Sequence, residues 1–345
     1  MSDVLLSVEN LTTVFDVPRQ PVVAVDDVSF EIRHGETLGL VGESGSGKSV
    51  TAFSIMQLLQ SPGRIAAGRV IFQGRDLLAL PEPEVRKVRG AGIGLIFQEP
   101  MAALNPVMRV GAQIAEALVV HRLATRAAAR ARAIELLSAV RITDPERRID
   151  DYPHQLSGGM RQRVMIAVAL ACGPPLIIAD EPTTALDVTV QAQILELLRD
   201  MKQQFRLSLL LITHDLGVIA ETADRVAVMY AGRIVEKGRV RDIFRNPLHP
   251  YTQGLLASIP GEGAGSRLRA IDGVVPNLAA LPPGCTFAAR CPYRMEVCTT
   301  AVPALVEIEP GHQVRCYLHS DQAENRRDAT SSPVVARSSD RNPEH

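Results

Sequence analysis

The 345-residue sequence lacks an apolar run long enough to cross a membrane. Its longest apolar stretch, residues 164–179, is interrupted by a Gly-Pro-Pro triplet. The first ten residues, MSDVLLSVEN, contain neither a charged leader nor the apolar core of a signal peptide. We therefore expect the chain to stay in the cytoplasm and to meet a membrane only through a partner.

An excess of charge of one sign is also missing. The 37 Lys and Arg residues are balanced by 38 Asp and Glu residues, giving a formal net charge of −1. A protein whose main partner is nucleic acid usually has a basic excess, so no nucleic-acid partner is expected. We interpret the arginines gathered in residues 122–148 as a solvated helix face. Tryptophan is absent and 46% of the residues are apolar, which fits a soluble α/β protein.

Cysteine is scarce, but four of the five cysteines fall within one short stretch: Cys285, Cys291, Cys298 and Cys316. A reducing cytoplasm argues against structural disulfides. Sulfur ligands suit both iron–sulfur clusters and zinc, although the stretch lacks the paired C-x2-C knuckles typical of zinc. Iron–sulfur ligation, zinc ligation and free thiols are the three interpretations. The fifth cysteine, Cys172, is expected to be a small core residue.

The first 260 residues alternate between two patterns. Residues 188–203 have apolar positions on one helix face, which predicts a helix. Short, nearly all-apolar runs predict buried parallel strands at residues 37–41, 93–97, 176–179 and 209–212. Strands alternating with helices indicate an α/β fold with a parallel sheet covered on both faces.

Two changes of composition divide the chain. Residues 109–148 are rich in Ala and Arg and predict a helical insertion, and beyond about residue 260 Pro, Gly and Cys dominate. The last stretch is polar and predicted to be disordered. The expected organisation is an α/β domain at residues 1–260 with a helical subdomain at about 100–172, a small Cys-rich C-terminal domain at 261–320, and a tail at 321–345.

The stretch GESGSGKS follows an apolar strand and precedes a helical pattern, which is the context of a phosphate-binding loop. Its backbone N–H groups and the helix N-terminus would surround a phosphate. Lys48 would reach the β- and γ-phosphates, and the Ser49 hydroxyl would bind Mg²⁺. The predicted ATP contacts in this stretch are Gly42, Ser44, Gly45, Ser46, Gly47, Lys48, Ser49 and Val50.

Three other predicted strands end in polar residues, namely Gln98, the pair Asp180-Glu181, and His214. The carboxyl ends of parallel strands meet at one sheet edge, so these side chains should converge on the γ-phosphate. Asp180 would hold Mg²⁺ through water, and Glu181 would be the general base for the attacking water. His214 would contact the γ-phosphate, and Gln98 would sense the metal and the water. Glu181, His214 and Gln98 form the predicted catalytic set.

The stretch LSGGMRQR, at residues 156–163, predicts a second anion site. Ser157 is suited to cap a helix that begins at Gly158 and Gly159, and free N–H groups at this end attract a phosphate. Because Lys48 already binds the one γ-phosphate of an ATP, we assign this site to ATP on another chain. Two chains packed head to tail would enclose two ATP molecules and separate after hydrolysis. An ordinary N-capped helix is the alternative.

The order of these motifs resembles the ATPase subunits of ABC transporters: GESGSGKS, Gln98, LSGGMRQR, LIIADE, Ala185-Leu186-Asp187 and His214. The likeness spans roughly residues 4–320. It implies a P-loop ATPase cassette with a parallel-sheet core, an antiparallel β subdomain and a helical insertion, using ATP and Mg²⁺. It also implies that Asp187 belongs to the D-loop and that Phe15 stacks on adenine.

Three further stretches resemble the oligopeptide/dipeptide/nickel importers: FQEPMAALNPV, NPLHPYTQGLLASIP and GCTFAARCPYRMEVC. The likeness implies a second ATPase subunit (a copy or a paralogue), two permease subunits and an extracytoplasmic solute-binding protein. The chain would then lie on the cytoplasmic face of the inner membrane. The resemblance favours a [4Fe–4S] cluster at the four clustered cysteines. Met101, Leu104 and Val107 would face the permease or belong to the core.

These observations lead to the hypothesis of an ATP-hydrolysing motor for peptide import. A soluble ABC ATPase acting in translation or DNA repair is the first alternative, but such proteins typically carry two cassettes or a long coiled-coil insertion. A regulatory module that binds ATP without hydrolysis is the second. The presence of Glu181 and His214 argues against it. The sequence does not specify the transported solute.

Overall fold

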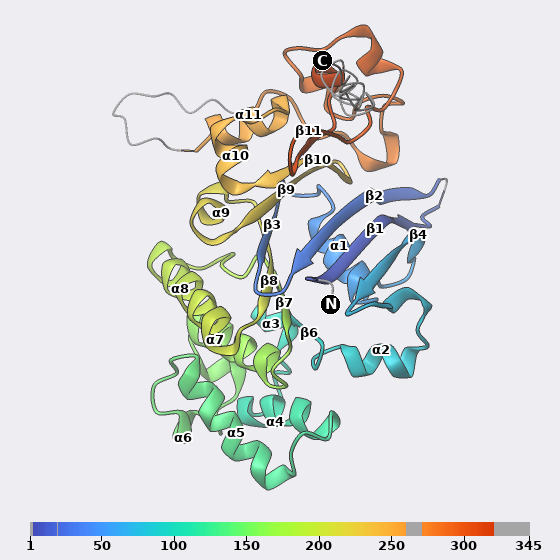
Figure 1. Ribbon diagram of the computed structural model, residues 1–345. Helices are drawn as coiled ribbons and strands as arrows, with labels where there is room; N and C mark the ends of the chain where they lie inside the picture. Colours follow the sequence, from blue (N-terminus) through green and yellow to red (C-terminus); the bar gives the residue numbers. More distant parts are fainter. Residues whose placement is uncertain (1–2, 19, 260–270, 321–345) are drawn as a thin grey trace, which may run out of the picture.

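The computed structural model describes residues 3–18, 20–259 and 271–320. Figure 1 shows two β-sheets on either side of helix α1 (Lys48–Ile55), a helical region at one end, and the C-terminal segment at the other. The predicted tail at 321–345 and the predicted domain boundary at residue 260 lie outside the described residues.

The larger sheet has eight strands in the order β11-β12-β10-β9-β3-β8-β7-β6. Strands β9, β3, β8, β7 and β6 run parallel, while β10, β11 and β12 pair antiparallel. Their bounds are β3 (Thr37–Val41), β6 (Ile93–Ile96), β7 (Leu176–Asp180), β8 (Ser208–Thr213), β9 (Arg225–Tyr230), β10 (Arg233–Arg239), β11 (Val306–Glu309) and β12 (His312–Val314). The four apolar runs predicted as buried parallel strands are thus confirmed as β3, β6, β7 and β8.

The smaller sheet is antiparallel and has the order β2-β1-β4-β5. Its strands are β1 (Val4–Phe15), β2 (Val22–Arg33), β4 (Gly63–Phe72) and β5 (Arg75–Asp76). One apolar cluster joins its inner face to α1 and to the larger sheet, with Leu6, Ile32, Ile55 and Leu210 all fully buried. This packing places α1, and the loop before it, between the two sheets.

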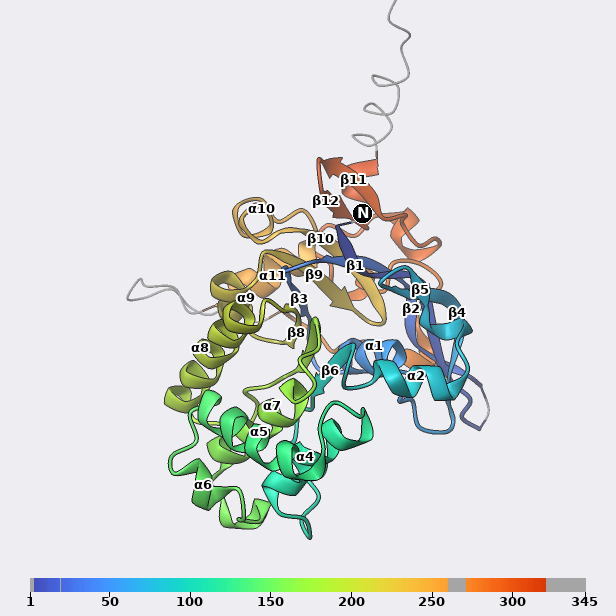
Figure 2. The same ribbon diagram turned by 60° about the horizontal axis from the view of Figure 1, so that its bottom comes forward.

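The helical region consists of α3 (Pro100–Ala103), α4 (Val110–Val120), α5 (Arg126–Ala139), α6 (Pro145–Arg148) and α7 (Gly158–Leu170). Figures 1 and 2 show α4, α5 and α6 together at the lower end of the molecule. Ile114, Leu136 and Val164 pack in a second apolar cluster that continues under the sheet. The predicted helical insertion is therefore present.

The remaining helices are α2 (Glu82–Val88), α8 (Val188–Phe205), α9 (Leu216–Thr222), α10 (Val240–Arg245) and α11 (Pro250–Ala257). Helix α8 begins at the predicted residue, 188, and ends at residue 205, two residues beyond the predicted end at 203. In the part of the chain that is described, no helix combines the length and apolarity needed to cross a membrane.

The described C-terminal segment, residues 271–320, consists of short 3-10 turns and the hairpin β11–β12. This hairpin continues the larger sheet through pairing of β12 with β10. Phe287, from the same segment, is 2% exposed and packs edge-on against Tyr230 of β9. The expectation of a small separate Cys-rich domain is therefore not supported, because the segment extends the sheet and core of the ATPase.

Candidate functional site

The phosphate-binding loop lies between β3 and α1, and two of its glycines have no room for a side chain. At Gly47, where φ is 103°, a Cβ would stand 2.5 Å from the Ala24 carbonyl oxygen. At Gly42 it would stand 2.1 Å from the Met229 carbonyl oxygen. Glycine at these positions lets the loop turn tightly against β2 and β9.

The loop borders a cavity of about 830 Å³. The predicted ATP contacts line it, except Ser46 and Phe15. The lining residues are Ala24, Gly42, Glu43, Ser44, Gly45, Gly47, Lys48, Ser49, Val50, Gln98, Glu181, His214, Leu255, Ser258, Ile271 and Leu278. The cavity therefore joins the loop to three strand ends that the sequence analysis assigned to one site.

Lys48 is buried, with 4% of its side chain exposed, and its ammonium group turns back onto the loop. It donates hydrogen bonds to the carbonyl oxygens of Gly42 and Glu43, at 2.8 and 3.0 Å, and lies 3.9 Å from a carboxylate oxygen of Glu181. Burial lowers the Lys48 pKa, while the nearby carboxylates raise it. The lysine is thus held in the wall of the cavity by two loop carbonyls and a nearby carboxylate.

Asp180, at the end of β7, is 1% exposed and accepts a hydrogen bond of 3.0 Å from the Ser49 hydroxyl. Burial raises the Asp180 pKa to about 6, against the lowering effect of that hydrogen bond. The neighbouring Glu181 carboxylate raises it further, and Lys48 lowers it. A hydroxyl and a carboxylate oxygen side by side match the hard oxygen ligands that Mg²⁺ prefers.

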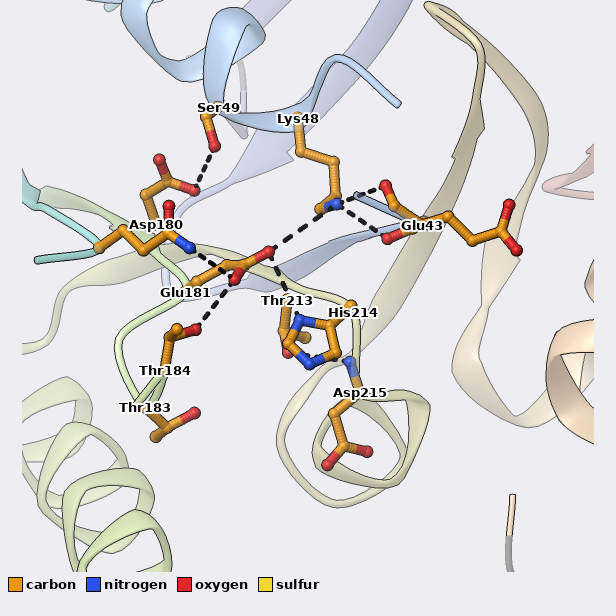
Figure 3. Close-up of polar contacts among 12 residues, drawn as sticks. Glu43, Lys48, Ser49, Asp180, Glu181, Thr183, Thr184, Thr213, His214 and Asp215 are labelled. Carbon is orange, nitrogen blue, oxygen red and sulfur yellow. Dashed lines mark hydrogen bonds and ion pairs between the residues drawn. The ribbon is translucent and has the colours of Figure 1, made fainter. Parts of the chain in front are cut away.

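Glu181 has a left-handed backbone, with φ of 44°, which is rare for a residue other than glycine. Its N–H donates to the Ile212 carbonyl oxygen of β8 at 2.9 Å. Its carboxylate accepts hydrogen bonds from Gln98, at 3.0 Å, and from the Thr184 hydroxyl, at 2.9 Å. His214 Nδ1 is 3.5 Å from the other carboxylate oxygen (Figure 3). The predicted catalytic residues therefore meet at one carboxylate, and Thr184 is a partner that the sequence analysis missed.

Phe15 is not among the residues that line this cavity. It is the last residue of β1, where it pairs with Val22 and Gly63, and its stacking on adenine stays a prediction. Apolar lining also comes from residues that the sequence analysis did not select: Leu255 of α11, with Ile271 and Leu278 of the C-terminal segment. The stretch NPLHPYTQGLLASIP, which contains Leu255, was the only signal in the sequence that pointed toward this wall.

Ser157 caps α7, as predicted, by accepting a hydrogen bond of 3.4 Å from the Met160 N–H. Ser157 and Gly158 are exposed and Gly159 is half-buried. None of these three residues lines the cavity that contains Lys48. Asp187, also exposed, caps α8 through a hydrogen bond of 2.9 Å from Val190. The phosphate-binding loop and the predicted second anion site of one chain thus do not line the same cavity.

The four clustered cysteines, Cys285, Cys291, Cys298 and Cys316, line one small cavity of about 10 Å³ and form no disulfides. Burial raises the pKa of Cys285, Cys291 and Cys316, the last to about 11. Such a volume holds about one water molecule. Among the described residues, no three His, Cys, Asp or Glu side chains are placed to hold a metal ion. The arrangement brings the donors together but does not support zinc or the expected [4Fe–4S] cluster. Cys172 follows α7 and is half-buried.

A glycine loop between a strand and a helix, a buried lysine, and an aspartate on the next-but-one strand together define a P-loop nucleotide site. The ABC transporter family profile matches residues 25–184, and the profile described as oligopeptide/dipeptide transporter, C-terminal region, matches residues 235–298. Both matches agree with the geometry of the site.

Curated relatives match almost end to end. The oligopeptide transport ATP-binding protein AppD of Bacillus subtilis is 54% identical, covering 92% of this chain and 98% of the relative. The dipeptide transport ATP-binding protein DppD of the same organism is 52% identical, covering 93% and 96%. The oligopeptide transport ATP-binding protein OppD of Escherichia coli is 51% identical, covering 92% and 94%.

Solved structures show the same fold. A dimeric post-hydrolysis structure of the cassette MJ0796, bound to ADP and Pi, has a TM-score of 0.62 at 29% identity, covering 68% of this chain and 99% of that chain. The structure of cbiO1 from Clostridium perfringens, part of an ABC transporter complex, has a TM-score of 0.61 at 27% identity, covering 71% of this chain and 92% of that chain.

The chain belongs to the ABC transporter family, among the ATP-binding subunits of the oligopeptide/dipeptide type. It is an ATPase coupled to transport, which favours the transporter hypothesis over translation, DNA repair or regulation.

Proposed function

We propose that the chain hydrolyses Mg-ATP in the cavity around Lys48 to drive the import of peptides. Lys48 and the loop N–H groups bind the phosphates, and Ser49 and Asp180 hold Mg²⁺ directly or through water. Gln98 is positioned to sense that metal. Glu181 accepts the proton of the attacking water, and His214 contacts the γ-phosphate. The names of relatives that transport oligopeptides and dipeptides support the choice of solute.

The main observation behind this proposal is that three side chains converge on the carboxylate of Glu181. Lys48, Gln98 and His214 come from three separate segments, and each lies within 4 Å of a Glu181 oxygen. Such a group can deprotonate a water that attacks a phosphate held by Lys48.

We propose that a second ATPase subunit, either a copy of this chain or a paralogue, completes the ATP-binding site. Ser157, Gly158 and Gly159 of one subunit then face the γ-phosphate held by Lys48 of the other. The exposed α7 N-terminus and its separation from the cavity of its own chain support this arrangement. Asp187, exposed at the start of α8, is assigned to the D-loop of the same interface. The dimeric structure of the neighbour with bound ADP and Pi is consistent with it.

We assign two permease subunits and an extracytoplasmic solute-binding protein as the other partners, which places the chain at the cytoplasmic face of the inner membrane. Met101 and Val107 are 49% and 80% exposed, whereas Leu104 is 4% exposed. Each of the two interpretations of this segment therefore fits different residues. Met101 and Val107 are accessible to a permease, whereas Leu104 belongs to the core.

ATP hydrolysis by the whole transporter tests the proposal. The complex, reconstituted in vesicles with its solute-binding protein, should hydrolyse ATP faster when a peptide is bound and should accumulate that peptide. Hydrolysis that depends on Lys48 but is unchanged by any peptide would refute the choice of solute. Absence of hydrolysis would refute the motor itself.

We further propose that the four clustered cysteines hold a [4Fe–4S] cluster, which would cross-link this turn-rich segment. Their shared lining of one cavity gathers four sulfur donors in this segment, and thiolate sulfur is the ligand of such clusters. Iron and acid-labile sulfide in a ratio near one, with a broad visible absorption that is lost in a Cys298→Ser variant, is the expected result. Protein purified without oxygen that contains neither iron nor sulfide would refute the cluster.

A further inference from the structure

The C-terminal segment reaches the phosphate-binding loop through one buried ion pair. Arg290 Nη1 and Nη2 donate to the two carboxylate oxygens of Glu43, at 2.7 and 3.0 Å. The arginine side chain is 5% exposed and that of Glu43 is 27% exposed. Two parallel hydrogen bonds of this kind are among the strongest pairs in proteins, and they fix orientation as well as distance.

The arginine is itself held in place by three further acceptors. Nε donates to the Asp272 carbonyl oxygen at 3.0 Å, Nη2 to the Ile271 carbonyl oxygen at 3.1 Å, and Nη1 to the Tyr230 hydroxyl at 3.3 Å. The hydrogen bonds to Glu43, helped by the Tyr230 hydroxyl and opposed by burial, raise the Arg290 pKa above its usual range. The guanidinium is therefore a fixed charge, held by the core strand β9 and by the C-terminal segment.

Glu43 is the second residue of the loop, and its backbone is part of the lysine site. Its carbonyl oxygen accepts one of the two carbonyl-directed hydrogen bonds of Lys48, at 3.0 Å, and its N–H donates to the Tyr251 hydroxyl at 2.9 Å. Its side chain lines the same cavity. A carboxylate at this position repels an incoming triphosphate unless an opposite charge neutralises it.

We propose that Arg290 is a positioning residue for nucleotide binding: it neutralises Glu43 and fixes the loop segment that orients Lys48. This inference rests on the proposed binding of ATP in the cavity. The C-terminal segment then contributes to the ATP site, because its Arg290 neutralises the negative charge of Glu43 in the phosphate-binding loop.

A double-mutant cycle separates this role from simple support of the fold. We would measure the Kd of ATP and of adenosine by calorimetry for the full chain and for E43Q, R290M and E43Q/R290M variants. R294M, a change at an exposed arginine in the same segment, is the matched control. We expect R290M to weaken ATP binding about tenfold and adenosine binding less than twofold, since adenosine has no phosphate charge. ATP affinity should recover in E43Q/R290M to within about threefold of the E43Q value.

Recovery upon removal of the glutamate charge is the decisive result, because a purely structural role of Arg290 predicts no such rescue. R290K keeps the positive charge and should stay within about threefold of the full chain even if R290M fails to fold. The proposal would be overturned if R290M lowered ATP affinity equally in the unmutated chain and in E43Q. It would also be overturned if ATP affinity were as low in R290K as in R290M. Failure of the unmutated chain to bind ATP would instead overturn the proposed function.

Discussion

The Ser49 hydroxyl donates a hydrogen bond of 3.0 Å to a carboxylate oxygen of Asp180, although 131 positions separate the two residues. Ser49 lies in the first turn of α1, and Asp180 ends β7. The register between neighbouring parallel strands brings them together, since Asp180 pairs with Ile212 of β8 and β8 pairs in turn with β3. The larger sheet thus brings together the two residues that we propose to hold Mg²⁺.

Glu181→Gln should retain ATP binding and lose turnover, because glutamine keeps the shape of the side chain but cannot accept the water proton. We expect phosphate release by the purified complex to fall by about 10²- to 10⁴-fold, the usual contribution of a general base. ATP-dependent association of the ATPase subunits should persist. Glu196→Gln, an exposed change on α8, is the control and should leave the rate unchanged. Near-normal phosphate release by Glu181→Gln would exclude the general-base role.

Asp180→Asn should stabilise the nucleotide-free protein at high pH. The pKa of Asp180 is about 6 in the folded state and 3.8 for an ordinary aspartate, so the folded state holds this proton more tightly than the unfolded state. Stability is therefore lost as pH rises from about 4 through 6, by about 3 kcal/mol. Asparagine carries no such cost, so the variant should gain stability relative to the unmutated protein at pH 8 and not at pH 4.

Urea denaturation of both proteins at pH 4, 6 and 8, without Mg²⁺ or nucleotide, measures this difference. Asp200→Asn, at an exposed carboxylate on α8, is the control and should not show the same pH dependence. A stability difference for Asp180→Asn that is constant across the three pH values would show that Asp180 is ionised throughout.

His214→Ala should lower turnover more than ATP affinity. His214 Nδ1 lies 3.5 Å from Glu181 and its side chain is 62% exposed, so the imidazole is available to a γ-phosphate without being needed for folding. We expect hydrolysis to fall about 100-fold, with the melting temperature unchanged. His34→Ala, at an exposed histidine in the turn between β2 and β3, controls for the loss of a histidine. Equal effects of the two variants on hydrolysis would contradict a catalytic role.

Gly47→Ala should abolish ATP binding and destabilise the protein by about 3 kcal/mol, since the new Cβ would lie 2.5 Å from a backbone oxygen in a left-handed conformation. Gly35→Ala provides the matched control. Its φ of 73° is also left-handed, yet nothing stands within 4 Å of the added atom. That variant should cost only about 1 kcal/mol, from the backbone alone. Chemical denaturation and ATP titration of both variants measure the difference, and similar losses would show that strain rather than contact limits Gly47.

The strand ends could be predicted from the sequence because the physics is local. Apolar runs of four to six residues define buried strands, and parallel strands must end at one edge, so Asp180, Glu181 and His214 have to approach Lys48. The helix after Ser157 was equally evident, since a capping serine before an apolar segment needs no tertiary information.

Contacts between distant, aperiodic segments could not be predicted. Arg290 lies in a stretch without hydrophobic period, 247 positions from Glu43, and nothing in either neighbourhood specifies the other. Leu278 and Ile271, which line the cavity, lie in the stretch AIDGVVPNLAAL, which has no helical or strand period. The Phe15 expectation depended on position in the chain alone, and it stays a prediction.

A structure of the Glu181→Gln transporter complex with Mg-ATP tests the central claim most directly. The account predicts that each ATP is shared, with Lys48 of one ATPase subunit on the γ-phosphate and the Ser157 hydroxyl of the opposing motif within about 3 Å of the same group. An ATP-loaded complex in which the LSGGM segment faces solvent or its own subunit, away from every γ-phosphate, would contradict it.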